Sequence, residues 1–457
     1  MRPMRSVVAP IVGALLAHAA LFSCASSDED VRPAPATPDG STVPAAEAGV
    51  EDASTPEGDI GDADARGRCS DGGFCYASLP LNVRNLVHVS ASSMDDVWAL
   101  SPDAVLRWDG ASWSTAYGAN NQGTAARFSG LWVSKKDDVW VLATDLDEPD
   151  SPVRIVRYSA LDGQPPAFRE RSIASVPSPY GEPDVHPVFG VTPASDALWL
   201  LDHRFPNPPD SVIRFREESD GSVVSDRVSI PVEEGDGSTY RWSSLWTFSA
   251  TDVYVGGSLC LAGHDPWSGR CATDFFGPAE DIGVIAHYDG TSWSITSLGA
   301  GAVLAMYGTK AAGQGRQLWL GVGAAPATPD RPFFGAESVR LVPIGDDGTI
   351  GAPLFSQRHR PSTSSTCSFL FGSVISPSAA WLSDGCLVYR WNGTALEPTP
   401  TAIDGQPPGR IDGLWAASAD DAWIVGRSSQ SAGLPRERWR GFAARRTKES
   451  APNEGAP

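Results

Sequence analysis

Asp138-Val139-Trp140-Val141-Leu142 is a short run of β-branched, aromatic and other apolar residues that recurs along this chain of 457 residues. Runs of this composition, bounded by turn residues, are typical of buried strands rather than helices. Seven copies can be aligned, centred on Trp98, Trp140, Trp199, Tyr254, Trp319, Trp381 and Trp423. A unit that repeats in this way indicates one repeat-built domain rather than several unrelated ones.

A second apolar run precedes each copy, as in Gly130-Leu131-Trp132-Val133 and Gly413-Leu414-Trp415-Ala416. We interpret it as a strand joined to the Trp-centred strand by a tight turn. Four copies have Asp two residues before the aromatic residue, at Asp96, Asp138, Asp252 and Asp421. A short carboxylate there can accept backbone N–H bonds within the turn, and we favour this role over a ring of catalytic acids.

A third run follows each Trp-centred strand and ends in a turn dipeptide. The dipeptides are Asp109-Gly110, Asp162-Gly163, Asp220-Gly221, Asp289-Gly290, Asp347-Gly348 and Asn392-Gly393. Such pairs tolerate the positive φ angles of a hairpin turn, so a fourth strand should fold back on the third. The seventh copy keeps Trp439 but has Arg440-Gly441 at the turn. His287 occupies a third-strand position where other copies have Arg, and we expect it on the surface.

Seven four-stranded units over residues 69–447 predict an all-β, seven-bladed β-propeller, although the spacing also permits six or eight blades. Ring closure has two solutions. A strand at Tyr76–Val83 would complete the last blade beside Phe442, or residues 442–447 would themselves form the outermost strand.

The repeats resemble those of bacterial surface lipoproteins. In those repeats a small residue is followed by Asp-Val-Trp. Further on come His or Arg, then Trp or Tyr, then Asp-Gly, then Thr or Ala, and finally Ser-Trp. The best matches are Asp96 to Trp113 and Asp252 to Trp293. The chain is more loosely similar to kelch and WD-repeat propellers, but it lacks their regular Gly-Gly and Gly-His landmarks. This resemblance implies a fold rather than an activity.

Residues 1–23 are typical of a signal peptide, with Arg2 and Arg5 before an apolar stretch. Leu21-Phe22-Ser23-Cys24 resembles the bacterial lipobox, which implies a diacylglycerol anchor on Cys24. Ordinary cleavage with an incidental Cys24 is the alternative. The resemblance further implies an outer-membrane lipoprotein, on the periplasmic side or the cell surface, because no Asp follows the Cys.

Residues 24–68 are rich in Pro, Ala and acidic residues, and we expect a disordered tether there; residues 448–457 are expected to form a disordered tail. The net charge of −20, with 35 basic against 55 acidic side chains, argues against a nucleic-acid partner. We expect a monomeric ring.

The seven cysteines fit an oxidising compartment, because lipidation of Cys24 leaves six for disulfides. The neighbouring scheme pairs Cys69 with Cys75, Cys260 with Cys271, and Cys367 with Cys386. A zinc site is disfavoured, because no pair has the spacing of a zinc knuckle. We expect neither a metal nor a cofactor.

Candidate ligand contacts lie in the long connections at 202–210, 256–283 and 321–337, between the second and third strands of three units. These contacts are Arg204, Phe205, Trp267, Phe275, Phe276, Phe333 and Phe334. Aromatic side chains beside charged ones can stack on sugars or hold a peptide, although each Phe pair can instead pack its own loop onto the ring.

The predicted function is a non-catalytic binding or scaffold module for glycan or protein, held at the cell envelope by a lipid. The seven His residues are scattered without a catalytic signature, so no catalytic residue is assigned. Two alternatives remain. One is a glycan-active hydrolase or lyase with carboxylates at the channel mouth. The other is a scaffold for outer-membrane assembly.

Overall fold

The structure is a computed structural model of the whole chain, which divides into residues 1–59 and residues 60–457. All the described residues belong to the second unit. They are 69–80, 83–118, 126–145, 152–160, 164–177, 189–191, 197–201, 211–217, 222–231, 239–260, 264–265, 270–271, 281–311, 315–323, 338–358, 371–403, 408–428 and 440–447.

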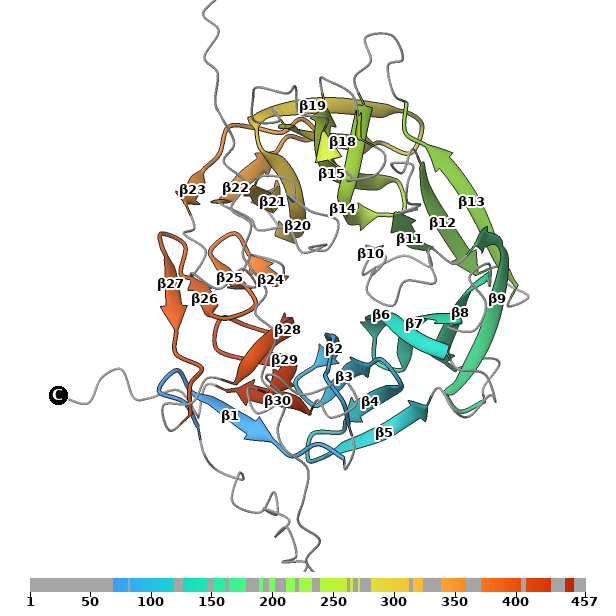
Figure 1. The fold of residues 1–457 in the computed structure, drawn as a ribbon, viewed down its shortest axis with the longest axis vertical. Coiled ribbons are helices and arrows are strands. Elements are labelled where there is room, and N and C mark those ends of the chain that lie inside the picture. Colours follow the sequence, from blue (N-terminus) through green and yellow to red (C-terminus); the bar gives the residue numbers. More distant parts are fainter. Residues whose placement is uncertain are drawn as a thin grey trace, which may run out of the picture. The chain divides into compact units, whose positions relative to one another are not determined.

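Seven four-stranded antiparallel sheets form the blades of a β-propeller, which confirms the predicted fold and blade count (Figure 1). In each blade we name the strands A to D from the centre outward. Blade 1 is β2 (His88–Ser93), β3 (Asp96–Ser101), β4 (Ala104–Trp108) and β5 (Trp113–Gly118). Blade 2 is β6 (Ala126–Lys135), β7 (Asp138–Asp145), β8 (Pro152–Ser159) and β9 (Ala167–Pro177). Blade 3 is β10 (Phe189–Val191), β11 (Ala197–Leu201), β12 (Ser211–Glu217) and β13 (Val223–Ser229).

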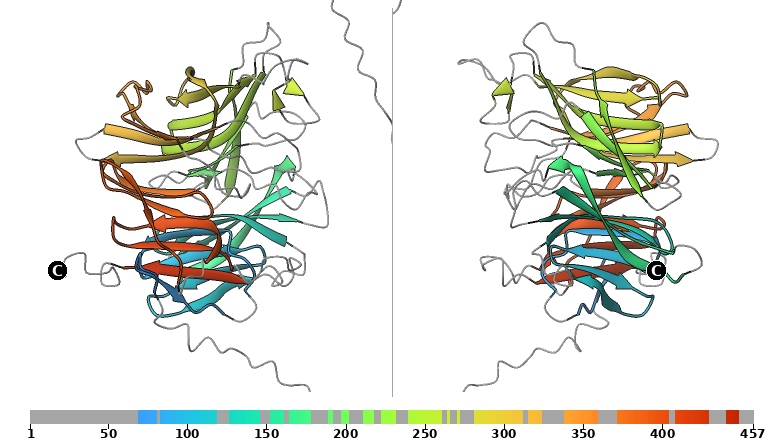
Figure 2. Two further views of the ribbon diagram at one scale, coloured as in Figure 1. Left: turned by 60° about the vertical axis from the view of Figure 1, so that its left-hand side comes forward. Right: turned by 90° about the vertical axis from the view of Figure 1, so that its right-hand side faces the viewer.

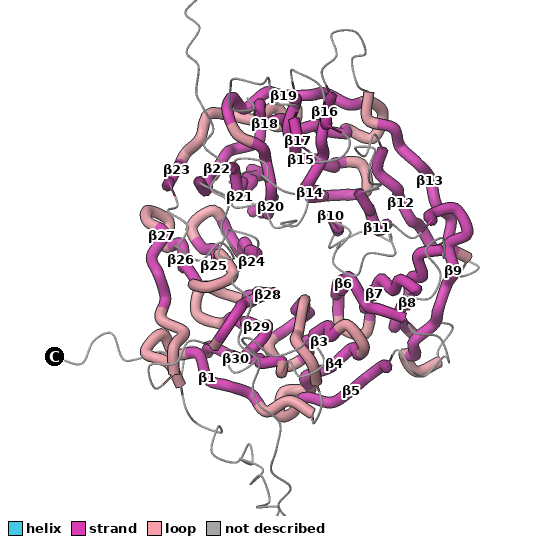
Figure 3. The backbone as a smooth tube through the Cα atoms, in the orientation of Figure 1, coloured by secondary structure: helices cyan, strands magenta, loops and turns pink. Residues whose placement is uncertain are grey.

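The remaining blades follow the same order around the ring (Figure 3). Blade 4 is β14 (Thr239–Ser249), β15 (Asp252–Cys260), β18 (Asp281–Tyr288) and β19 (Trp293–Ala300). Blade 5 is β20 (Ala302–Ala311), β21 (Gly315–Gly323), β22 (Ser338–Ile344) and β23 (Phe355–Arg358). Blade 6 is β24 (Phe371–Ser376), β25 (Ala379–Ser383), β26 (Val388–Trp391) and β27 (Leu396–Thr399). Blade 7 is β28 (Gly409–Ala416), β29 (Ala422–Ser428), β30 (Gly441–Arg446) and β1 (Phe74–Ala77).

The N-terminal strand closes the ring, because β1 pairs antiparallel with β30 as strand D of blade 7. The first of the two predicted closures is therefore correct, but the strand begins at Phe74 and ends at Ala77 rather than spanning 76–83. The alternative that made 442–447 the outermost strand is wrong. Arg440-Gly441 is not a turn between strands C and D, since Gly441 begins strand C and strand D comes from the other end of the chain.

The repeated aromatic residue of strand B forms the core between blades. Trp98, Trp199, Trp381, Trp423 and Tyr254 are fully buried. Trp98, for example, packs against Phe128 and Val139 of blade 2. Burying a side chain of this size stabilises the fold by roughly 2–3 kcal/mol. Because these side chains are buried between blades, each repeat adds to the free energy of unfolding chiefly through its contact with a neighbouring blade.

The antiparallel order places the connections on two faces, seen from the side in Figure 2. The A–B and C–D turns share one face, which we call the turn face. The B–C and D–A connections share the opposite face, which we call the loop face. Turn-face connections are mostly short, as between β6, which ends at Lys135, and β7, which begins at Asp138. On the loop face β15 ends at Cys260 and β18 begins only at Asp281, with a ribbon of β16 (His264–Asp265) and β17 (Arg270–Cys271) between them.

Among the described residues there is no helix, and hence none long and apolar enough to cross a membrane.

Candidate functional site

The predicted ligand contacts lie in B–C connections of three consecutive blades. The strands that flank these connections are β11 and β12, β15 and β18, and β21 and β22, which belong to blades 3, 4 and 5. All six strands meet the connections on the loop face. Arg204, Phe205, Trp267, Phe275, Phe276, Phe333 and Phe334 themselves lie outside the described residues, as does Cys24.

The structure joins Cys69 and Cys75 by a disulfide, with an S–S distance of 1.99 Å. Cys260 and Cys386 are disulfide-bonded as well. The side chains of Cys271 and Cys367, their predicted partners, lie outside the described part of the chain.

The turn face carries charged networks built on the Asp at the start of strand B in four blades, at Asp96, Asp138, Asp252 and Asp421. In blade 1 the Asp96 carboxylate accepts hydrogen bonds from Ser92 Oγ at 2.7 Å and Arg107 Nε at 3.0 Å. In blade 2 Asp138 accepts from Ser134 Oγ and, at 2.8 Å, from Arg157 Nε. The donors are therefore side chains rather than the predicted backbone N–H groups. The strand C Arg supplies a charged donor, which makes a stronger hydrogen bond than a neutral one.

The Asp that precedes this residue reaches across to the neighbouring blade. Asp137 of blade 2 pairs with Arg107 of blade 1 at 3.2 Å. Asp420 of blade 7 pairs with Arg390 of blade 6 at 3.0 Å. Asp95 of blade 1 lies 3.7 Å from Arg445 of blade 7, so the pattern continues across the ring closure. In three blades the two Asp residues of the doublet thus have different partners. The second Asp makes hydrogen bonds within its own blade, and the first forms an ion pair with an Arg of the preceding blade. Only the second Asp was singled out from the sequence, although the doublets at 95–96, 137–138 and 420–421 carried the signal.

The strand C cations also stack on the strand B aromatics. The guanidinium of Arg157 lies 4.3 Å from the Trp140 ring centre, and that of Arg107 lies 4.9 Å from the Trp98 ring centre. Burial alone would lower the pKa of Arg107, but the charges of Asp96 and Asp137 outweigh it and the pKa is raised. These cations hold the scaffold together through cation–π contacts and ion pairs.

Blade 4 departs from this pattern at His287, which is buried and not on the surface as predicted. Its ring stacks on Tyr254 with centres 4.4 Å apart, and its Nε2 lies 3.0 Å from Asp252 Oδ1. Arg316 of blade 5 donates to the other oxygen of Asp252. The neighbouring blade thus supplies the guanidinium that blade 4 lacks. Burial raises the pKa of Asp252, but the hydrogen bonds from His287 and Arg316 outweigh it and the pKa is lowered.

The dipeptides at 109–110, 289–290, 347–348 and 392–393 form C–D turns as predicted, whereas Asp162-Gly163 and Asp220-Gly221 lie outside the described residues. The Asp289 carboxylate accepts the backbone N–H groups of Thr291 and Ser292 at 2.8 and 2.7 Å. These bonds and one from the Thr291 hydroxyl lower the pKa of Asp289. Asn392 accepts the equivalent bonds from Thr394 and Ala395 through its amide oxygen.

Asp412 is the one described carboxylate whose pKa is raised. It lies at a β-bulge in β28, the innermost strand of blade 7. Burial raises its pKa despite Arg410, whose Nε lies 2.7 Å from Asp412 Oδ1. Within the described ranges no group of three or more His, Cys, Asp or Glu side chains is placed to hold a metal ion.

No protein family and no curated protein matches the sequence. Solved structures with a similar course of the chain include YCF48 from Cyanidioschyzon merolae, with 11% identity, 82% of this chain and 99% of that chain covered, and a TM-score of 0.49. YCF48 bound to D1 peptide has 12% identity, 84% and 97% coverage and a TM-score of 0.46. A streptogramin B lyase structure has 11% identity, 81% and 96% coverage and a TM-score of 0.46. At these identities and TM-scores the similarities carry no functional conclusion.

Proposed function

We propose that this chain is a lipid-anchored propeller of the cell envelope that acts as a non-catalytic binding or scaffold module, with its binding surface on the loop face of blades 3, 4 and 5. The propeller fold is consistent with a module of this kind. The observation that carries the proposal is the asymmetry between the two faces. Long connections of neighbouring repeats on one face of a ring commonly form its binding surface.

The side chains of the turn face support a binding surface on the loop face. Many of its described Asp, Arg and Ser side chains make contacts within and between blades, as in the Ser92, Asp96 and Arg107 group. The long connections lie on the loop face, where residues 261–280 separate β15 from β18. The Phe275-Phe276 and Phe333-Phe334 pairs there offer flat apolar surfaces for a sugar ring or an extended peptide.

The anchor would join the ring at its closing strand. The predicted lipid at Cys24 is followed by the acidic tether and then by Cys69, directly before β1. A disordered tether of this length has a reach of roughly 35–40 Å. Arg446 holds the segment before β1 through the Gly72 carbonyl and also bonds Asp420 in the A–B turn of blade 7. The described start of this segment, residues 69–73, therefore lies near the turn face.

The test is capture by the full-length chain, purified from membranes and immobilised. It is offered peptidoglycan fragments, exopolysaccharide and an extract of envelope proteins. We expect capture of one class by the unchanged chain. A variant with Phe275, Phe276, Phe333 and Phe334 changed to Ala should lose that capture by at least about tenfold, as removal of several buried aromatic contacts does in other interfaces.

A matched control changes two exposed turn-face residues, Lys135 and Lys136, to Ala. It should capture the same class as the unchanged chain. Equal capture by the Phe variant would contradict the loop-face site, and no capture of any class would contradict a binding module. Release of new sugar ends from the glycans would instead support the hydrolase or lyase alternative.

A further inference from the structure

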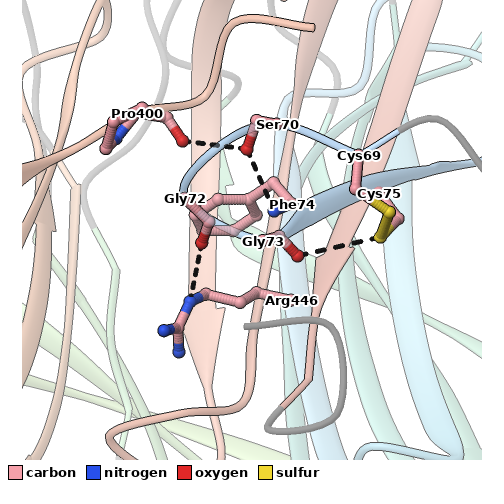
Figure 4. The surroundings of a disulfide bond; sticks show 8 residues. All are labelled: Cys69, Ser70, Gly72, Gly73, Phe74, Cys75, Pro400 and Arg446. Carbon is pink, nitrogen blue, oxygen red and sulfur yellow. Dashed lines mark hydrogen bonds between the residues drawn. A yellow bond between two sulfur atoms is a disulfide. The ribbon is translucent and has the colours of Figure 1, made fainter. Parts of the chain in front are cut away.

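The segment before β1 is a covalently closed hairpin. Ser70 donates its backbone N–H to the Phe74 carbonyl at 2.8 Å, and Gly73 donates to the Ser70 carbonyl at 2.8 Å. The Ser70 hydroxyl accepts the Phe74 N–H at 3.0 Å. The Cys69–Cys75 disulfide closes this loop covalently (Figure 4).

This hairpin links two blades besides completing one. The Ser70 hydroxyl donates to the Pro400 carbonyl, just after strand D of blade 6, at 2.9 Å. The Gly72 carbonyl accepts from Arg446 Nε of blade 7 at 2.9 Å. Phe74 is fully buried, and its ring meets Trp381 of blade 6 edge-on at 5.9 Å. A side chain at Gly72 would collide with the Pro400 carbonyl, so the loop fits closely between the blades.

The strand that this hairpin positions is short. β1 pairs only Phe74 to Ala77 with β30, and this pairing is what joins the two ends of the propeller in one sheet. A four-residue edge strand is weak by itself. Because the disulfide removes most of the conformational freedom of the loop when it is undocked, less entropy is lost when the loop docks. The bond therefore stabilises ring closure in particular.

The bond is also open to exchange. Cys69 is exposed, whereas Cys75 is half-buried. A small dithiol can attack the Cys69 sulfur as a thiolate, so that Cys75 leaves as a thiolate and takes up a proton. The second thiol of the dithiol then attacks the mixed disulfide and releases Cys69, and the dithiol is oxidised to a disulfide.

We propose that the Cys69–Cys75 disulfide is a redox-controlled clasp on the ring: its reduction by a dithiol weakens the pairing of β1 with β30, so that blade 7 opens more often while the other six blades stay folded. The proposal concerns ring closure and stands apart from the binding surface proposed on the loop face.

The experiment uses the full chain and dithiothreitol as the dithiol. Free thiols at positions 69 and 75 are counted by alkylation and mass spectrometry, and amide hydrogen exchange is followed in the same samples. As Cys69 and Cys75 become alkylated, exchange should rise roughly 10- to 50-fold at 74–77 and 441–446, which corresponds to the loop-closure entropy of a short disulfide loop. Exchange at 96–108 in blade 1 should not change.

A variant with Cys69 and Cys75 both changed to Ser separates this bond from the other disulfides. Without reductant it should show the exchange pattern of the reduced chain. Full protection at 74–77 and 441–446 after alkylation of both thiols would overturn the proposal. An equal rise in all seven blades would overturn it as well, because the bond would then support the whole fold and not its closure.

Discussion

Arg446 donates a hydrogen bond from Nε to the carbonyl oxygen of Gly72 at 2.9 Å, across 374 positions of sequence. The same guanidinium lies 5.2 Å from the Trp381 ring centre and donates through Nη1 to the Asp420 carbonyl at 2.8 Å. One buried side chain therefore contacts blade 6, the A–B turn of blade 7 and the segment before the closing strand.

Arg446→Met should weaken ring closure strongly. Methionine retains the length of the side chain but leaves the Gly72 and Asp420 carbonyls without their charged donor, and we expect a loss of about 2–3 kcal/mol in the free energy of unfolding. Urea denaturation followed by Trp fluorescence measures this loss. Lys136→Met is the matched control, because Lys136 is exposed. A change smaller than the control's would show that Arg446 does not hold the closure.

The two Asp residues of a doublet should contribute unequally. Asp96 is buried and bonds Ser92, Trp98 and Arg107, whereas the Asp95 side chain is 75% exposed and 3.7 Å from Arg445. Asp96→Ala should cost about 2–3 kcal/mol, because it removes the acceptor of Ser92, Trp98 and Arg107 and leaves Arg107 only its more exposed partner Asp137. Asp95→Ala should cost less than about 0.5 kcal/mol, as exposed ion pairs do. Equal losses in thermal or urea denaturation would contradict this division.

Acid should remove the contribution of Asp252 to the free energy of unfolding. The pKa of Asp252 is lowered in the folded chain, so its contribution is fully present above the unfolded pKa of about 3.9 and is lost as the pH falls through the folded pKa. Stability should therefore fall less steeply below about pH 4 in Asp252→Asn than in the unchanged chain.

Asp412 should behave in the opposite way. Its pKa is raised by burial, so ionisation disfavours the folded state and stability rises as the pH falls from the folded pKa toward the unfolded pKa of about 3.9. Asp412→Asn should lose this gain, and its stability should fall more steeply on acidification than that of the unchanged chain. Urea midpoints of the Asp252 and Asp412 variants across the acid range test both signs. Parallel curves for the two variants would contradict the assignment.

Gly348 should not tolerate a side chain. Its φ is +85°, and a Cβ there would collide with the His287 ring of the neighbouring blade. Gly348→Ala should cost roughly 3 kcal/mol through backbone strain and overpacking together. Gly315 has a φ of +75° but open space around the Cβ position, so Gly315→Ala should show only the strain of roughly 1–2 kcal/mol. Equal Tm values for the two variants would contradict the contact with His287.

The fold could be predicted from the sequence because each blade repeats the same residue types at the same strand and turn positions. A Trp at the same place in each strand B and Asp-Gly at the C–D turns are local signals, and they predicted seven blades and the buried aromatic core correctly. The closing strand was located only approximately. Four residues paired with a partner at the other end of the chain leave little periodic pattern.

Charged residues were harder to predict than apolar ones. His287 was expected on the surface because the equivalent positions carry Arg, but the partners that bury it, Tyr254 and Asp252, are visible only once the strands are paired. The ion pair between Asp137 and Arg107 likewise depends on how two blades pack together, and the residue spacing within one repeat does not show this. The proposed ligand contacts stay a prediction, since they fall in connections that vary from blade to blade.

Lipidation of Cys24 is the claim on which the proposed compartment and the display of the ring both depend. The most direct measurement is metabolic labelling with an alkyne-bearing fatty acid in a double-membrane bacterium, followed by membrane fractionation of the full chain and of Cys24→Ala. We predict label and outer-membrane recovery for the unchanged chain, and an unlabelled, membrane-free product for the variant. Equal membrane recovery and no label in either chain would contradict the account.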